Sequence, residues 1–233
     1  MKIICDVVAD VFRLFYPKTC AACGNELLST EKAICFSCLN DLPLTDFVQY
    51  EDNPVAKKFW GRAAVQHAAS IFYFRKESRI QQIFHELKYL DNQMVGVELG
   101  KIAANELTKA SWIHEIDFIL PVPLSDKKLY QRGYNQSEKI AEGISDVLKI
   151  PCLPDALIRH KHTQSQASLT LKERIENVKD AFSLKCPEKL KGCHVLLLDD
   201  VMTTGSTIES CIQTLQQAES ISISVLTMAY AID

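Results

Sequence analysis

The sequence lacks an excess of positive charge, the usual signature of a protein that binds nucleic acid over a broad surface. Its 233 residues contain 26 lysines and arginines against 29 aspartates and glutamates, and the formal net charge is −3. This balance gives no long-range attraction to a polyanion, although it still allows a local basic patch. Nucleic-acid binding is therefore a hypothesis that needs separate support.

Long uninterrupted apolar runs are also absent. No segment reaches the roughly 18 to 20 apolar residues that a membrane-spanning helix needs. The apolar start of the chain is broken by Asp6 and Asp10 before a secretory core can form. We read residues 1–15 as an amphipathic helix, and we expect a soluble, cytoplasmic protein without membrane contact.

Hydrophobic residues make up 47% of the chain, enough for one substantial core with a small appended module. The stretch from Glu51 to Gly61 is polar and contains Pro54, which favours a boundary near residue 55. We therefore predict an amino-terminal module over 1–55 and a second domain over 56–233.

The nine cysteines divide into two groups. Four of them form two Cys-x-x-Cys pairs with eleven residues between the pairs: Cys20, Cys23, Cys35 and Cys38. This spacing is typical of a closed, structural zinc site with four thiolates. Two unrelated pairs of buried cysteines remain an alternative, and a redox dithiol is disfavoured because neither pair opens a helix. The other cysteines are read as small apolar residues.

Strand and helix patterns alternate after residue 60. Strands are expected at 67–76, 116–124, 195–201 and 222–231, and helices at 79–90, 95–107, 137–148 and 206–218. We expect a loop at 125–136, with Asn135 or Ser137 capping the next helix. That helix should bury Ile140, Ala141, Ile144, Val147 and Leu148, and 159–178 should be a mobile loop. The order is that of an α/β domain with a largely parallel sheet.

The segment VLLLDDVMTTGST, residues 195–207, carries the main candidate site. Ligands of parallel sheets bind beyond the carboxyl ends of the strands, where this segment passes from a strand to a helix. Hydroxyls, a glycine and the helix amino terminus suit a phosphate at 203–207, whereas Asp199 and Asp200 suit a neutral part of the same ligand, such as sugar hydroxyls. Helix capping and ordinary turn chemistry are the structural alternatives. A Walker loop is excluded because its Gly-Lys-Ser/Thr ending is missing.

This segment resembles the phosphoribosyl diphosphate-binding motif of type I phosphoribosyltransferases. Further matching segments are LKY at 87–89, PVPL at 121–124, QRGYNQ at 131–136 and ERIENVKDAF at 173–182. Together with the four cysteines, they make the chain similar to the ComF family, also called ComFC or GntX-like, over nearly its whole length.

The resemblance implies a type I phosphoribosyltransferase fold with an amino-terminal zinc knuckle, and a site for phosphoribosyl diphosphate and magnesium. Asp199, Asp200 and Arg132 are the expected catalytic residues, with Arg132 receiving the diphosphate; Lys127 and Lys128 either assist or are simply solvated. A lid is expected over 159–174, which includes His160, His162, Thr163 and Gln166. The residues expected to bind the ligand are Pro123, Leu124, Val201, Thr203, Thr204, Gly205, Ser206 and Thr207.

Three functions remain open at this stage. The chain could transfer phosphoribosyl to an unidentified acceptor with release of diphosphate, as an enzyme of the glycosyltransferase class. It could instead be a competence or DNA-uptake factor that handles single-stranded DNA, alone or with competence proteins, and uses phosphoribosyl diphosphate as a ligand. A sensor that has lost turnover is the third reading.

Overall fold

The computed structural model describes residues 17–160 and 181–232. The predicted helix over 1–15 and most of the predicted lid, including His162, Thr163 and Gln166, lie outside the described residues.

A four-stranded sheet forms the centre of the molecule, in the order β1-β6-β5-β2. All three pairings between neighbours are parallel. The strands are β1 (Ala68–Phe74), β2 (Phe118–Pro121), β5 (His194–Met202) and β6 (Ser222–Ala231). Their apolar runs are buried from both sides, as expected for strands of a parallel sheet. The predicted α/β class with a parallel sheet is confirmed.

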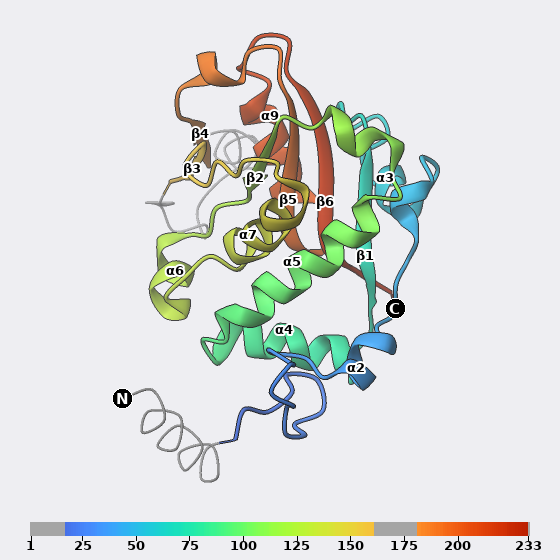
Figure 1. Ribbon diagram of the computed structural model, residues 1–233. Helices are drawn as coiled ribbons and strands as arrows, with labels where there is room; N and C mark the ends of the chain where they lie inside the picture. The colour runs from blue at the N-terminus through green and yellow to red at the C-terminus, as the bar shows by residue number, and fades with distance from the viewer. Residues whose placement is uncertain (1–16, 161–180, 233) are drawn as a thin grey trace.

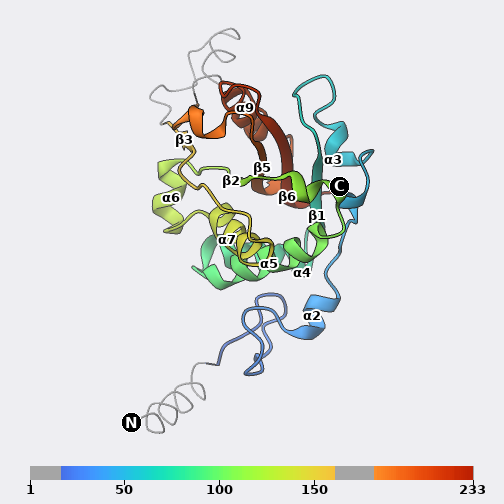
Figure 2. The ribbon, with the colours of Figure 1, turned by 45° about the horizontal axis from the view of Figure 1, so that its top comes forward.

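Helices cover both faces of this sheet. Figures 1 and 2 show α9 (Ser206–Leu215) on one face, and α5 (Gln93–Leu107) with α7 (Gln136–Leu148) on the other. Helix α4 (Arg79–Tyr89) follows β1 and buries Ile80, Ile83, Phe84 and Leu87, as predicted. The remaining elements are α2 (Phe36–Asn40), η1 (Phe47–Gln49), α3 (Pro54–Lys57), η2 (Ser111–Glu115), α6 (Asp126–Arg132), β3 (Leu157–Arg159), β4 (Phe182–Leu184) and η4 (Pro187–Leu190).

No helix among residues 17–160 and 181–232 combines the length and the apolar character needed to cross a membrane.

Glycines bring α5 and α7 into backbone contact. A Cβ atom on Gly100 would lie 2.1 Å from the carbonyl oxygen of Ile140, and one on Gly143 would lie 2.1 Å from the carbonyl oxygen of Val97. Any side chain at either position would push the helices apart. This crossing holds the start of α7 near the carboxyl end of β5, where the candidate site lies.

Two sequence predictions about this region are wrong in detail. The predicted loop at 125–136 contains α6, which ends at Gly133 with the left-handed φ of 77° that favours glycine. Helix α6 buries no side chain, so its sequence carries no apolar periodicity to reveal it. Val147 is 40% exposed because α7 turns it away from the core near its end. Asn135 is the cap of α7, as one of the two predictions had it.

The four-cysteine segment, residues 17–41, is attached to the helices through polar contacts. The Glu98 carboxylate on α5 accepts hydrogen bonds from the backbone nitrogens of Ala33 and Ile34, at 2.9 and 3.1 Å. Arg79 at the start of α4 pairs with Asp41 at 2.5 Å. Both views show this segment beside α4, away from the sheet (Figures 1 and 2).

The chain that follows this segment covers the free edge of β1. The backbone nitrogen of Thr45 donates to the carbonyl of Ile71 at 3.0 Å, and that of Tyr73 donates to the carbonyl of Pro43 at 2.8 Å. The Asn53 side chain caps α3 and also donates to the carbonyl of Ala68. The division of the chain at residue 55 stays a prediction.

Candidate functional site

Two adjacent carboxylates mark the carboxyl end of β5. The Oδ1 atom of Asp199 accepts hydrogen bonds from the Asp200 backbone nitrogen at 2.9 Å and from the Ser137 hydroxyl at 3.4 Å. The Oδ1 atom of Asp200 accepts from the Val201 backbone nitrogen at 2.6 Å. Successive side chains of a strand point to opposite faces of the sheet, so the two carboxylates leave β5 toward opposite faces.

Lys88 supplies a cation at this pair. Its ammonium nitrogen lies 2.7 Å from Oδ2 of Asp200, and both side chains are about four-fifths buried. The ammonium also stands 5.5 Å from the centre of the Phe84 ring. Lys88 comes from the last turn of α4, which the sequence places more than a hundred residues before Asp200. The folded chain therefore assembles a Lys–Asp–Asp group from two distant segments.

The pKa of Asp199 is raised to about 7, chiefly by burial and also by the neighbouring Asp200 carboxylate, although the hydrogen bonds from Asp200 and Ser137 and the charge of Lys88 act to lower it. A carboxyl group with a pKa near neutrality can change its protonation when a cation or a hydrogen-bond donor arrives. The acid pair therefore has the electrostatics of a binding site for donors or cations.

The hydroxyl loop follows directly, at residues 203–207. Gly205 has a φ of 81° and is the N-cap of α9, and having no side chain it cannot cap the helix itself; the Ser206 backbone nitrogen instead donates to the Thr204 hydroxyl oxygen at 3.5 Å. The hydroxyl oxygens of Thr204 and Ser206 lie 3.1 Å apart. Thr203, Thr204 and Ser206 are exposed, whereas Thr207 is half-buried. Exposed hydroxyls and the N–H groups at a helix amino terminus are a suitable environment for a phosphate group.

The connection from β2 to α7 forms the neighbouring wall. Asn135 donates to the carbonyl of Val122 at 3.1 Å and accepts from the backbone nitrogen of Ser137 at 3.1 Å. The Tyr134 hydroxyl donates to the carbonyl of Leu87, next to Lys88. These bonds fix Ser137 beside Asp199 and fasten the end of α4 to the same wall.

Arg132 is held on this wall at the end of α6. Its guanidinium donates to the Gln136 side-chain oxygen at 2.6 Å and lies 5.7 Å from the centre of the Tyr89 ring. Pro123 and Leu124 are half-buried residues between β2 and α6. Since Tyr89 follows Lys88, Arg132 and Lys88 are brought to the same region from α6 and α4.

Other residues that the sequence suggested for the site have exposed side chains. Lys127 and Lys128 are exposed on α6. His160 is exposed, and its Nε2 atom lies 2.8 Å from the Ser183 hydroxyl, in the hairpin of β3 and β4. Nothing in these contacts distinguishes the two lysines or His160 from solvated surface residues.

The four cysteines come together as the spacing predicts. The Sγ atoms of Cys20, Cys23, Cys35 and Cys38 all lie within 4.8 Å of one another, and those of Cys23 and Cys35 are 3.9 Å apart. A tetrahedral zinc ion with Zn–S bonds of about 2.3 Å needs sulfurs roughly 3.8 Å apart. The Cys20 sulfur also accepts from the Cys35 backbone nitrogen at 3.3 Å, as thiolates in such knuckles do. The donor set fits a structural zinc ion.

Sequence reasoning left the role of Lys88 open, considered Ser137 only as a possible helix cap, and did not single out Gln136. Lys88 belongs to the LKY segment and the other two to QRGYNQS, so the motifs were visible. Their contacts with Asp200, Asp199 and Arg132 depend on the packing of separate helices, which no sequence spacing records.

Comparisons with known proteins agree with this picture at the level of family. No model of a known protein family matches the chain. Competence protein F of Haemophilus influenzae is 31% identical over 153 residues, which cover 64% of this chain and 67% of that protein. DNA utilization protein YhgH of Shigella flexneri is 30% identical over 139 residues, covering 58% of this chain and 60% of that protein.

Among solved structures, the glutamine phosphoribosylpyrophosphate amidotransferase from B. subtilis is 19% identical, with a TM-score of 0.42. The match covers 60% of this chain and 30% of that one. A likeness this distant carries no conclusion about activity. The sequence relatives are closer, and by its similarity to competence protein F the chain belongs to the ComF family.

Proposed function

We propose that the carboxyl edge of β5 binds phosphoribosyl diphosphate with magnesium, and that the protein transfers the phosphoribosyl group to an acceptor. The observation that carries this proposal is the direct succession of an acid pair and a hydroxyl loop at the start of α9, with the Lys88 cation on Asp200 and the Arg132 cation against the ring of the next residue, Tyr89. A sugar phosphate that also bears a diphosphate matches all three parts.

Each part has a ligand group suited to it. The N–H groups and hydroxyls at 203–207 suit the 5-phosphate. Asp199 and Asp200 suit the two ribose hydroxyls as hydrogen-bond acceptors. Magnesium prefers carboxylate and phosphate oxygens and retains several waters, so it needs few protein ligands beside the acids. When bound, it would be held by Asp199 or Asp200 and would neutralise negative charge that develops on the diphosphate.

Lys88 and Arg132 would act on the leaving group. In the transfer, the bond from the anomeric carbon to the diphosphate oxygen breaks, and a bond to the acceptor forms. Negative charge grows on the diphosphate, and cations placed there stabilise it. The arginine fork suits a diphosphate. The Lys88 ammonium is bound to Asp200 in the structure, so ribose binding at Asp200 would release it toward the diphosphate.

Calorimetric titration with phosphoribosyl diphosphate and magnesium tests the binding. We expect Asp200→Asn and Thr204→Ala each to weaken binding about tenfold or more, because each removes a hydrogen-bonding partner of a charged ligand. Asp146→Asn, an exposed carboxylate far along α7 from Ser137, is the matched control and should bind as the unaltered protein does. Equal affinity of all four proteins, or no binding by any, would overturn the proposal. Diphosphate release in the presence of candidate acceptors then tests transfer.

Handling of single-stranded DNA is a second candidate function. It is favoured by exposed aromatic rings beside cations: Tyr89 is 65% exposed with Arg132 against its ring, and Tyr130 on α6 is 92% exposed. Alternating rings and cations form stacking platforms for single strands. The printed names of the two relatives, competence protein F and DNA utilization protein, point in the same direction.

Fluorescence anisotropy with a labelled single-stranded oligonucleotide tests this second function. Binding that weakens with salt and is reduced in Tyr130→Ala would support it. Tyr50→Ala, another exposed tyrosine away from α6, serves as the control. Absence of binding at low salt would remove this candidate.

A further inference from the structure

A cavity lies at the far end of α4 from Lys88. It has a volume of 740 Å³ and opens at the carboxyl end of the edge strand β1. Its lining residues come from three segments: Asp41 and Pro43 after the four-cysteine segment, Tyr73, Arg75, Ser78, Arg79 and Ile80 around the start of α4, and Ile232 after β6. Pockets for small organic ligands measure roughly 300 to 1,000 Å³.

This cavity is separate from the proposed phosphoribosyl site. Ile80 and Lys88 are eight positions apart on α4, which corresponds to a rise of about 12 Å at 1.5 Å per residue. None of Asp199, Asp200, Arg132 or the hydroxyl loop lines it.

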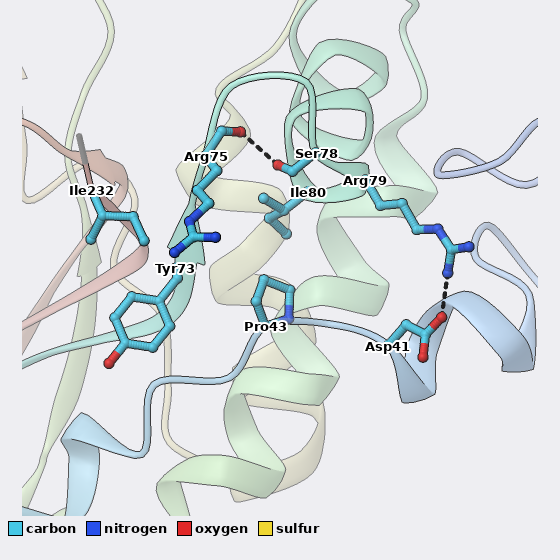
Figure 3. Close-up of a pocket in the computed structure, with 8 residues that line it drawn as sticks. All are labelled: Asp41, Pro43, Tyr73, Arg75, Ser78, Arg79, Ile80 and Ile232. Carbon is cyan, nitrogen blue, oxygen red and sulfur yellow. Dashed lines mark hydrogen bonds and ion pairs between the residues drawn. The ribbon is translucent and has the colours of Figure 1, made fainter.

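The cationic groups of the cavity differ in their partners. Arg79 is engaged by Asp41 at 2.5 Å. Arg75 lies in the turn after β1, where its backbone carbonyl accepts from the Ser78 hydroxyl at 2.6 Å. Within residues 17–160 and 181–232, no carboxylate pairs with the Arg75 guanidinium. Figure 3 shows this guanidinium between Ile232 and Ile80, above Tyr73 and Pro43.

The walls around Arg75 are flat or apolar. Ile80 is fully buried against the core below the cavity, and the Tyr73 ring is fixed by an edge contact with Phe47, with ring centres 5.5 Å apart. A fixed aromatic ring, a proline ring and the half-buried Ile232 suit a planar ring system. A free guanidinium suits a phosphate group, which it can bind with two parallel hydrogen bonds. The hydroxyl of Tyr73 can serve a polar edge of the ligand.

We propose that this cavity binds a nucleotide, with the phosphate on Arg75 and the base against Tyr73 and Ile232. The nucleotide is either free or part of a single strand, since both present the same base and phosphate. The proposal concerns a site beyond the phosphoribosyl site and does not depend on it.

Calorimetry with the four nucleoside monophosphates, and separately with adenosine and inorganic phosphate, tests the site. We expect at least one monophosphate to bind, and Arg75→Gln to weaken it about tenfold or more, because a charged hydrogen-bonded pair is lost. Lys76→Gln, the neighbouring exposed cation that does not line the cavity, is the matched control and should change the affinity less than about twofold.

The Asp200→Asn variant separates the two sites. A monophosphate could also occupy the proposed phosphoribosyl site, so binding that survives Asp200→Asn and is lost in Arg75→Gln supports the cavity. Binding that is lost in Asp200→Asn and kept in Arg75→Gln overturns it. Inorganic phosphate binding as tightly as the nucleotide also overturns it, since the apolar walls would then contribute nothing.

A short single-stranded oligonucleotide distinguishes the source of the nucleotide. If the oligonucleotide binds more tightly than the monophosphate and Arg75→Gln weakens both, the natural ligand is a strand. If only the monophosphate responds to Arg75→Gln, the ligand is free. Asp233 follows Ile232 in the sequence, so each comparison is repeated in Asp233→Asn; a response to Arg75→Gln that disappears there would overturn the proposal.

Discussion

Asp199 is a carboxyl group that the fold keeps in an unfavourable environment. Burial raises its pKa to about 7, from an ordinary value of 3.8, and the adjacent Asp200 acts in the same direction. At a pH between these two values, Asp199 therefore keeps its proton in the folded protein, whereas it has lost that proton in the unfolded chain. By linkage, this residue lowers the free energy of unfolding progressively as pH rises from about 4 to about 7. Such a residue costs stability, which is expected where function selects it.

The first prediction follows from this sign. Asp199→Asn keeps the shape of the side chain but cannot ionise, so it should raise the melting temperature, and more so at about pH 8 than at about pH 5. A gain of at least about 1 kcal/mol corresponds to about 2–4 °C for a chain of this size. Thermal unfolding at both pH values measures it. If Asp199→Asn melts at the same temperature as the unaltered protein at the higher pH, or at a lower one, the result would contradict the pKa shift.

At this scale the sequence shows only the contiguous part of the site. Asp199, Asp200 and the loop at 203–207 follow one another along the chain, so their order alone suggested an acid pair beside an anion loop. Lys88 reaches Asp200 from the end of α4, which Tyr134 contacts through the carbonyl of Leu87. The contact between Lys88 and Asp200 is tertiary, so it cannot be inferred from the sequence around either residue.

At the scale of elements, the crossing of α5 and α7 depends on glycine. Gly100 and Gly143 face each other with no room for a Cβ atom on either. The amphipathic patterns predicted both helices correctly, but they gave no sign of this close approach. Helix α6 shows the reverse: it is a real helix with no buried side chain, and so no pattern predicted it.

The second prediction concerns this crossing. Gly100→Ala should lower the free energy of unfolding by about 3 kcal/mol, because the new methyl group would meet the backbone of Ile140 and separate the helices. Urea unfolding measures the change. Glu142→Ala, an exposed position on α7, is the control and should stay within about 0.5 kcal/mol. A Gly100→Ala protein as stable as the control would mean that the helices can separate freely.

The third prediction concerns the four-cysteine segment. Apart from the cysteines, its buried apolar residues are alanines and the single Ile34, and its attachment to α5 includes the hydrogen bonds to Glu98, so the metal should supply most of its folding energy. We expect about one zinc ion per chain by elemental analysis. Chelation should open residues 17–41 to proteolysis while the domain with the sheet stays folded.

Variants at single cysteines sharpen this test. Cys35→Ser should lose the zinc and show the same cleavage without chelator, whereas Cys186→Ser, outside the cluster, should keep the metal. A protein without zinc, or one in which chelation leaves residues 17–41 resistant to protease, would contradict the prediction.

At the scale of the whole molecule, the carboxyl ends of the parallel strands (the carboxyl edge) and their amino ends (the amino edge) carry different kinds of side chain. The carboxyl edge carries the acid pair, the hydroxyl loop and the cavity at Arg75. The amino edge carries a stack in which the His67 ring lies 4.9 Å from Trp112 and 6.5 Å from His194. The strand patterns predicted the α/β class, but the pairing of β1 with β6 joins the two ends of the domain and could not be predicted from local patterns.

The histidine stack gives the last prediction. Burial lowers the pKa of both His67 and His194 below 6.5, although Glu51 and Glu115 oppose this at His67, and Glu115 and Asp117 at His194. The unfolded chain therefore binds protons that the folded protein resists, and stability should fall as pH drops through about 6.5. Asp199 acts in the opposite direction over an overlapping range, so the effect is cleanest in Asp199→Asn.

In that background, the urea midpoint should decrease between about pH 7 and about pH 5. Adding His67→Phe and His194→Gln should remove at least half of the decrease, because phenylalanine keeps the stack on Trp112 and glutamine keeps a donor for Ser224. If the triple variant loses stability over this range as steeply as Asp199→Asn alone, the acid sensitivity arises elsewhere. If the decrease disappears, His67 and His194 at the amino edge cause the loss of stability at low pH. Asp199 at the carboxyl edge then accounts for the change in stability at higher pH.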